Sequence, residues 1–235
     1  VQLLIKLIEE DKVDFVFPPC GTTYLYASAP VANKHEYILV GLEGGALKIE
    51  EYAAALPYFF AMLNFSATQM PALADVYKQN GITSAAIIYI DDLHGIEYMT
   101  TAAAEFEQRG IAVKMARSVP LGVQDVSMHL KRAQELGVDA FLAFTYPGAG
   151  SILAPKQAIA MGIDFKAFHV NVAANFGWFR DMFGDAAEGF TGGGGWNCKS
   201  SAGAREFCDK FIPRYGEPAV DWWGHLVYWA GVQVF

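Results

Sequence analysis

Charged residues are scarce in this sequence, at 18% of 235 residues, whereas hydrophobic residues make up 53%. This balance excludes a disordered chain and favours sheets that helices cover. Basic residues are also in the minority, because 17 Lys and Arg stand against 25 Asp and Glu, for a net charge of −8. A nucleic-acid partner or an anionic membrane surface needs a basic face, so we expect neither.

Long apolar runs are absent too, so the sequence predicts no membrane span. The first ten residues form an amphipathic pattern that contains acids, which is not the pattern of a signal peptide. Because the sequence begins inside this helical pattern and without Met, we expect it to be a fragment that lacks at least one upstream strand.

Several catalytic patterns are missing. There is no phosphate-binding loop with Lys and Ser or Thr, and no dinucleotide pattern of three spaced glycines. The glycine run at 192–195 instead predicts a hinge or a loop. The five histidines share no metal-ligand spacing, and Gly150-Ser151 lacks the second glycine of a nucleophile elbow. We therefore expect no enzyme, no metal and no cofactor.

Cysteines are few, and their number is odd: Cys20, Cys198 and Cys208. Two alternatives stay open from the sequence. Cys198 and Cys208 form a disulfide in an oxidising compartment, or all three are free and buried thiols.

Apolar runs alternate with amphipathic segments along the chain. Strands are predicted at residues 13–17, 37–42, 57–62, 84–90, 111–117, 138–144 and 167–171. Helices are predicted at residues 1–11, 22–33, 68–79, 96–109, 125–136, 202–215 and 220–235, with a further one that ends near 161. This alternation predicts parallel sheets joined by right-handed crossovers. The segments near residues 63–66 and 192 are the expected crossings between two lobes, with a cleft between the lobes.

Polar turns follow several of these strands, and ligands of open α/β sheets collect at the carboxyl ends of strands. Residues 91–95, Asp-Asp-Leu-His-Gly, follow the buried run at 84–90. His94 is either a polar turn residue or a ligand contact. A third hypothesis is an α/β enzyme that uses His94 together with Asp91 or Asp92.

Two earlier turns offer similar alternatives. Thr22 or Thr23 caps the helix that follows, or the free helix N–H groups there bind a carboxylate. Gly44 and Gly45 allow the backbone to approach a ligand closely, or they simply make a turn. Aromatic residues near turns, such as Tyr24, add the apolar surface that a small-molecule site requires.

Four segments, in this order, carry a resemblance. They are residues 13–17 with the small-residue turn that follows, AAIIYIDDLHG from residue 85, GVDAFLAFTYPGAG from residue 137 and GDAAEGFTG from residue 184. The chain resembles the branched-chain amino-acid-binding (Leu/Ile/Val-binding) family, which are type I periplasmic substrate-binding proteins of ABC transporters. The resemblance implies a two-lobed α/β fold, in which each lobe is a mostly parallel sheet flanked by helices and the ligand cleft lies between the lobes.

The resemblance also implies lobe boundaries. Residues 1–65 would form an incomplete first lobe without its first βα region, residues 66–192 the second lobe, and residues 193–235 an incomplete return to the first. Nine residues match ligand-contacting positions of the family: Gly21, Thr22, Thr23, Glu43, Gly44, Gly45, His94, Tyr146 and Asn171.

Three of these positions depart from the family pattern. Gly45 stands where a Thr is expected, and His94 where a Tyr commonly precedes the glycine. Asn171 falls near an acid that grips the ligand ammonium in amino-acid-binding members. A buried ammonium without a counter-charge is costly, so we expect a small organic acid or amide ahead of a free amino acid. Its expected stacking partners are Tyr24, Tyr146 or Trp178, and the acids able to replace Asn171 are Asp91, Asp92 and Glu43.

The function implied is a periplasmic or other extracytoplasmic solute-binding protein. It would close on a small-molecule ligand and deliver it to an ABC permease. The alternative in the same fold is a ligand-sensing domain of a receptor or regulator.

Overall fold

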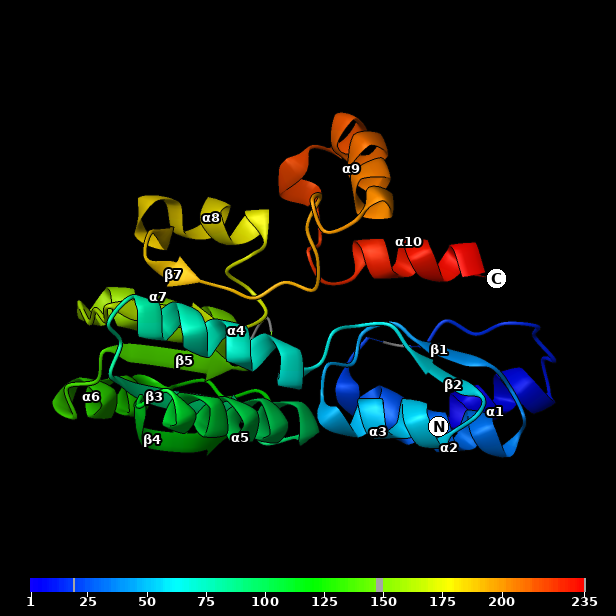
Figure 1. The fold of residues 1–235 in the computed structure, drawn as a ribbon, viewed down its shortest axis with the longest axis horizontal. Helices are drawn as coiled ribbons and strands as arrows, with labels where there is room; N and C mark the ends of the chain where they lie inside the picture. Colours follow the sequence, from blue (N-terminus) through cyan, green and yellow to red (C-terminus); the bar gives the residue numbers. More distant parts are fainter. Residues whose placement is uncertain (19, 147–149, 235) are drawn as a thin grey trace.

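The computed structural model describes residues 1–18, 20–146 and 150–234. It contains two parallel sheets, which lie at opposite ends of the long axis (Figure 1). The strands are β1 (Leu39–Gly41), β2 (Phe59–Ala61), β3 (Ser84–Ile90), β4 (Ala112–Val119), β5 (Ala140–Phe144), β6 (Ala167–Val170) and β7 (Phe190–Thr191). The helices are α1 (Gln2–Glu9), α2 (Thr22–Lys34), α3 (Leu47–Ala55), α4 (Ser66–Gln79), α5 (Leu93–Gln108), α6 (Ser127–Glu135), α7 (Gly150–Met161), α8 (Gly177–Phe183), α9 (Ala202–Tyr215) and α10 (His225–Val234), with short 3₁₀ helices η1 (Gly184–Ala187) and η2 (Glu217–Ala219).

The larger sheet has the strand order β4-β3-β5-β6-β7, and every pair in it is parallel. Strand β3 lies inside this sheet, and its side chains point alternately to the two faces. Ala86 and Ile88 pack into a core with residues of α6 and α7, whereas Ala85 and Ile87 pack into a second core with residues of α4 and α5. Helices therefore cover both faces, which explains the continuously apolar run. The predicted parallel α/β fold is confirmed.

The smaller sheet pairs β1 with β2 in parallel. Helices α1, α2 and α3 contribute to its core, which includes Leu4, Leu25 and Ile49. Helix α10 lies over this end of the molecule in Figure 1. Its Gly231 approaches Leu42, just after β1, so closely that an added Cβ would lie 2.8 Å from the Leu42 side chain. The last helix therefore packs against the β1 end of the chain.

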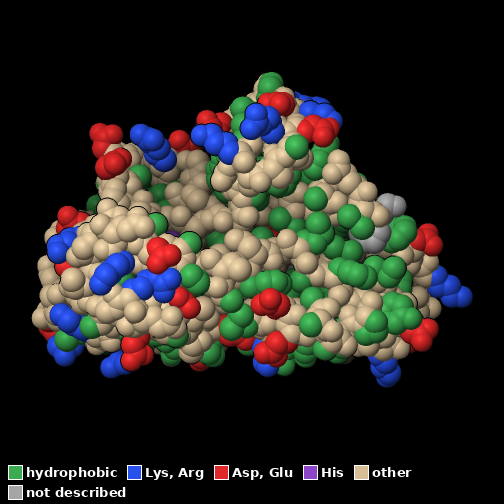
Figure 2. All heavy atoms as spheres, in the orientation of Figure 1, with side chains coloured by type: hydrophobic (Ala, Val, Ile, Leu, Met, Phe, Trp, Pro, Cys, Tyr) green, Lys and Arg blue, Asp and Glu red, His purple; other side chains and the backbone are tan. Residues whose placement is uncertain are grey.

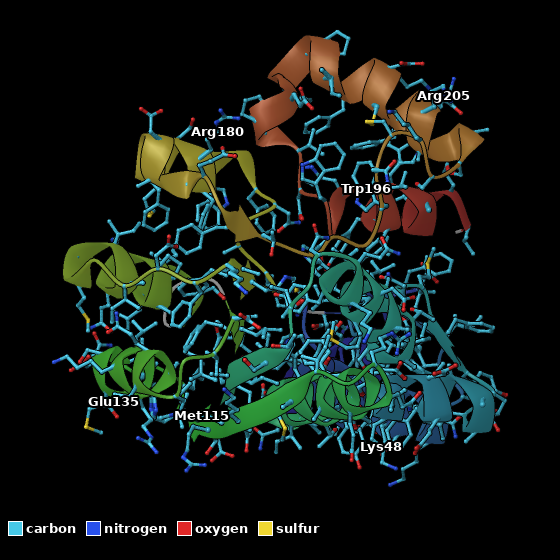
Figure 3. The ribbon with its side chains drawn as sticks, turned by 60° about the vertical axis from the view of Figure 1, so that its left-hand side comes forward. Lys48, Met115, Glu135, Arg180, Trp196 and Arg205 are labelled. Atoms are coloured by element: carbon cyan, nitrogen blue, oxygen red, sulfur yellow. A yellow bond between two sulfur atoms is a disulfide. The ribbon has the colours of Figure 1, made fainter. Side chains whose placement is uncertain are left out.

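Helix α9 is tied to the segment before it by a disulfide between Cys198 and Cys208, whose Cα atoms are 5.9 Å apart. The alternative of free thiols is thus wrong for this pair, and Cys20 is a free cysteine. Trp196 lies beneath α9 (Figure 3) in a small core that also contains Phe207. Helix α9 and the segment before it therefore form an apolar cluster that is separate from the cores of the two sheets.

Two predicted elements differ from the structure. Residues 13–17 belong to neither sheet, because the smaller sheet is formed by β1 and β2 and the larger one by β3 to β7. The helix predicted at 220–235 begins only at His225. Residues 221–224 form a turn instead, and this turn reaches the site described below.

Two surface properties bear on partners. In the part of the chain that the structure describes, no helix is long and apolar enough to cross a membrane. On the face shown in Figure 2, Lys and Arg side chains are interspersed with Asp and Glu and form no continuous basic patch.

Candidate ligand-binding site

A cavity of about 190 Å³ lies where the beginnings of α2 and α5 meet the chain segments after β1, β5 and β6 and the turn before α10. Its lining residues are Cys20, Gly21, Thr22, Glu43, Gly45, Leu63, His94, Tyr98, Tyr146, Val172, Phe176, Asp221 and Trp223. The segments that line it thus follow strands of both sheets, as expected for ligand sites in α/β folds.

Helix α2 begins at the cavity wall. Its N-cap is Gly21, with φ of 117°, a conformation that favours glycine. Neither Thr22 nor Thr23 caps the helix through its side chain, so the capping prediction is wrong; the cap falls one residue earlier than expected. The Thr22 hydroxyl is buried and has no hydrogen-bond partner among the residues that the structure describes. Free N–H groups at a helix start favour a negatively charged or acceptor group nearby.

The segment after β1 brings Glu43 and Gly45 to the cavity. Burial raises the pKa of Glu43; a hydrogen bond with the Cys20 thiol opposes this, and the charge of Asp221 adds to it. A Cβ added at Gly45 would lie 2.5 Å from the Tyr98 hydroxyl. The Thr that the family carries at this position would therefore collide with Tyr98.

The N-cap of helix α5 is Asp92, whose carboxylate accepts three hydrogen bonds. One carboxylate oxygen accepts from the Gly95 backbone N–H at 2.9 Å. The other accepts from the hydroxyls of Thr23 at 3.3 Å and Tyr146 at 3.0 Å. Asp92 therefore connects the starts of α2 and α5 to the turn after β5.

His94 is buried between two tyrosine rings, with its ring centroid 4.4 Å from that of Tyr98 and 5.0 Å from that of Tyr146. Burial lowers the pKa of His94 to about 4, although the charge of Asp92 acts in the opposite direction. The ring is therefore neutral near pH 7, and its Nε2 has no partner within the described part of the chain. Asp91 is exposed, and the Asp92 carboxylate accepts from Gly95, Thr23 and Tyr146.

Six of the nine sequence-predicted residues line this cavity: Gly21, Thr22, Glu43, Gly45, His94 and Tyr146. Three do not. Thr23 lines an adjoining hollow on the other side of Tyr146, together with Tyr24 and both Asp91 and Asp92. Gly44 packs against Leu25 and Ile49 in the core of the smaller sheet. Asn171 is fully buried beside a separate hollow near α4 and residues 192–194.

Several residues that line the cavity are not among the nine sequence-predicted residues. Tyr98 follows His94 by four positions and so lies on the same face of α5, a signal that the sequence contains. Asp221 and Trp223 were hidden inside a predicted helix, although Gly224 interrupts its pattern. Of the three expected stacking partners only Tyr146 lines the cavity. Tyr24 is 60% exposed, and Trp178 packs against the core of the larger sheet.

Three buried polar atoms of residues around the cavity have no hydrogen-bond partner among the described residues: Thr22 Oγ1, His94 Nε2 and Trp223 Nε1. An unpaired buried polar group costs about 1–3 kcal/mol, so such groups normally find a ligand or water. No group of three His, Cys, Asp or Glu in the described residues could hold a metal ion. The arrangement is suited to hold a small polar molecule.

Comparison with known proteins agrees with this geometry. A family model described as "Periplasmic binding protein" matches residues 1–234. The chain belongs to the periplasmic binding protein family. The fold of this family member is the type I form, in which related proteins have two lobes built from parallel sheets and helices.

Solved structures of the same fold include a leucine-binding protein from Thermotoga maritima, with a TM-score of 0.85 and 19% identity over 98% of this chain and 65% of that one. A solute-binding protein of an ABC transporter from Rhodopseudomonas palustris BisB5, in complex with 3,4-dihydroxybenzoic acid, has a TM-score of 0.79 and 21% identity over 99% of this chain and 63% of that one. An extracellular ligand-binding receptor from Rhodopseudomonas palustris HaA2 has a TM-score of 0.72 and 17% identity over 80% of this chain and 52% of that one. This chain therefore spans between about half and two thirds of these relatives, and at such identities the likeness is one of fold.

Proposed function

We propose that this chain is the ligand-binding part of an extracytoplasmic solute-binding protein. It captures a small organic acid, amino acid or amide in the cavity and delivers it to an ABC permease in the membrane. The observation that carries the proposal is a cavity of about 190 Å³ whose lining segments follow strands of both sheets and bring polar and aromatic side chains together. Relatives of the same fold are described as binding leucine or 3,4-dihydroxybenzoic acid, which are both small molecules.

The proposal includes closure of two lobes around the solute. Residues 1–65 and 193–235 form one lobe, and residues 66–192 form the other. The packing of α10 against Leu42 supports this division, because it brings the end of the chain back to the β1 sheet. Branched-chain amino acids are among the candidate ligands, because the sequence resembles the family that binds them.

Calorimetry and thermal-shift measurements on the complete protein test this function, with amino acids, aromatic acids and amides as the panel. A binder present at 100 times its Kd stabilises the protein by about 2.7 kcal/mol. We expect Tyr146→Ala to lower the affinity for that binder at least tenfold. The matched control is Tyr26→Ala, because Tyr26 stacks on Tyr52 away from the cavity. The absence of any binder, or an unchanged affinity in Tyr146→Ala, would contradict the proposal.

A ligand-sensing domain is the second candidate, because one structure of this fold is described as an extracellular ligand-binding receptor. The two functions differ in what a cell loses with the protein. Deletion of a transport protein abolishes uptake of the labelled ligand, whereas deletion of a sensor leaves uptake intact and abolishes a response to the ligand.

A further inference from the structure

Two acidic side chains converge in the cavity. Glu43 follows β1, and Asp221 lies in the turn before α10. One Asp221 oxygen accepts from the Trp223 backbone N–H at 2.8 Å. A Cβ added at Gly224 would meet the other Asp221 oxygen, at 2.7 Å, and also a Glu43 oxygen. Glycine at position 224 therefore leaves both carboxyl groups facing the same small space.

No protein cation balances these acids. The lining of the cavity contains neither Lys nor Arg, and none of the ion pairs among the described residues includes Glu43 or Asp221. Both acids are half-buried, and a carboxylate withdrawn from water is costly unless an opposite charge or hydrogen bonds accompany it. The cavity thus holds two neighbouring carboxyl groups for which the described residues supply no counter-ion.

The remaining walls suit a cation. Tyr98, Tyr146, Phe176 and Trp223 line the same cavity. Aromatic rings attract ammonium groups through the negative potential of their faces, most strongly where water is excluded. Thr22 and His94, polar residues at the starts of α2 and α5, line the other walls.

We propose that the solute carries a cationic nitrogen, and that Glu43 and Asp221 bind this nitrogen while aromatic side chains surround it. This inference rests on the proposed function and narrows it. It reverses the expectation of an organic acid, which depended on the neutral Asn171, because Asn171 does not line the cavity. A solute that is only an anion would place its negative charge next to the two acids.

Calorimetry at pH 7.5 on the complete protein tests the inference with two sets of probes of matched carbon skeleton. The first set is leucine, 4-methylpentanoate and 3-methylbutylamine, and the second is phenylalanine, 3-phenylpropanoate and 2-phenylethylamine. Any further binder from the wider panel is compared with its analogue without the nitrogen. We expect the members with an ammonium group to bind at least tenfold more tightly than the corresponding acids.

Two variants test whether Glu43 and Asp221 bind the cationic nitrogen of the solute. Glu43→Gln and Asp221→Asn should each lower the affinity for the ammonium-bearing member at least tenfold, with the fold checked by circular dichroism. Asp91→Asn is the matched control, because Asp91 is exposed and does not line the cavity. A binder that lacks a cationic nitrogen, or folded variants of both residues with unchanged affinity, would overturn the inference while the solute-binding function stands. Failure of every compound to bind would contradict that function as well.

Discussion

His94 and His169 are buried histidines whose surroundings keep them neutral. Burial lowers the pKa of each to about 4 from a usual value of 6.5. As the pH falls below about 6.5, the unfolded chain takes up a proton on each histidine, whereas the folded protein does so only near pH 4. The free energy of unfolding should therefore decrease between pH 6.5 and 4 and be insensitive to these groups above that range.

Urea unfolding at pH 7.5 and pH 5.0 checks this prediction. At pH 5.0 each histidine should account for a loss of about 2 kcal/mol. We expect His94→Gln and His169→Gln each to reduce the pH-dependent loss by about this amount, and the double variant to reduce it by about twice as much. If His94→Gln lost as much stability as the unmodified protein between the two pH values, the neutral state of His94 would be disproved.

Gly45 is required by its neighbour Tyr98. A Cβ at this position would lie 2.5 Å from the Tyr98 hydroxyl oxygen and 3.4 Å from Cζ of the same ring. Gly45→Ala should therefore destabilise the protein by about 1–3 kcal/mol, the usual cost of overpacking. In a Tyr98→Phe background the closest atom is gone, so the same substitution should cost much less. A double-mutant cycle by urea unfolding measures the difference, and equal costs in the two backgrounds would exclude this contact as the cause.

The start of α5 shows how an element positions the site. Asp92 caps α5 and also accepts from Thr23 and Tyr146, whereas Ser201 caps α9 through one bond to the Ala204 N–H at 3.0 Å. Ser201→Ala should cost about 1 kcal/mol, as caps usually do. Asp92→Ala should cost more, because it also leaves the Tyr146 hydroxyl without its acceptor.

A third variant separates the two roles of Asp92, which are the cap of α5 and the acceptor for Thr23 and Tyr146. Asp92→Ser keeps a capping oxygen, so we expect the capping part of the stability, about 1 kcal/mol, to return. The affinity for ligand should be reduced in both Asp92 variants, since Tyr146 lines the cavity and loses its acceptor. Urea unfolding and calorimetry give the two readings. Equal destabilisation by Asp92→Ala and Ser201→Ala would mean that the hydrogen bonds from Thr23 and Tyr146 to Asp92 contribute nothing to stability.

At the same scale, the elements differ in how much the sequence predicted. Strand β3 and helix α5 were predictable because one continuous apolar run ends in a polar turn and a helical pattern follows. Residues 13–17 have a similar apolar character, but strand formation depends on a distant partner that no local pattern reveals. Helix α8 has seven residues and escaped prediction, since so short a segment shows little periodicity. Asp221 and Trp223 reach the site only through tertiary packing.

For the whole molecule, a few polar contacts connect the two ends that carry the sheets. The Glu97 carboxylate on α5 accepts from the Lys48 backbone N–H at 3.2 Å, at the start of α3. The Thr23 hydroxyl donates to Asp92, as described above. These contacts join α2 and α3 to α5, so they stabilise the arrangement in which segments from both ends line the cavity.

Weakening these contacts should shift the molecule toward a more open form. A hydrogen bond to a charged group contributes about 1.5–3 kcal/mol, so Glu97→Ala combined with Thr23→Val should lower ligand affinity about tenfold or more. Without ligand, the radius of gyration from small-angle X-ray scattering should increase, and saturating ligand should restore it. Glu105→Ala is the matched control, because Glu105 lies on the same helix but pairs with Arg109 within it. A double variant whose scattering and affinity match those of this control would show that the contacts between the two ends do not govern closure.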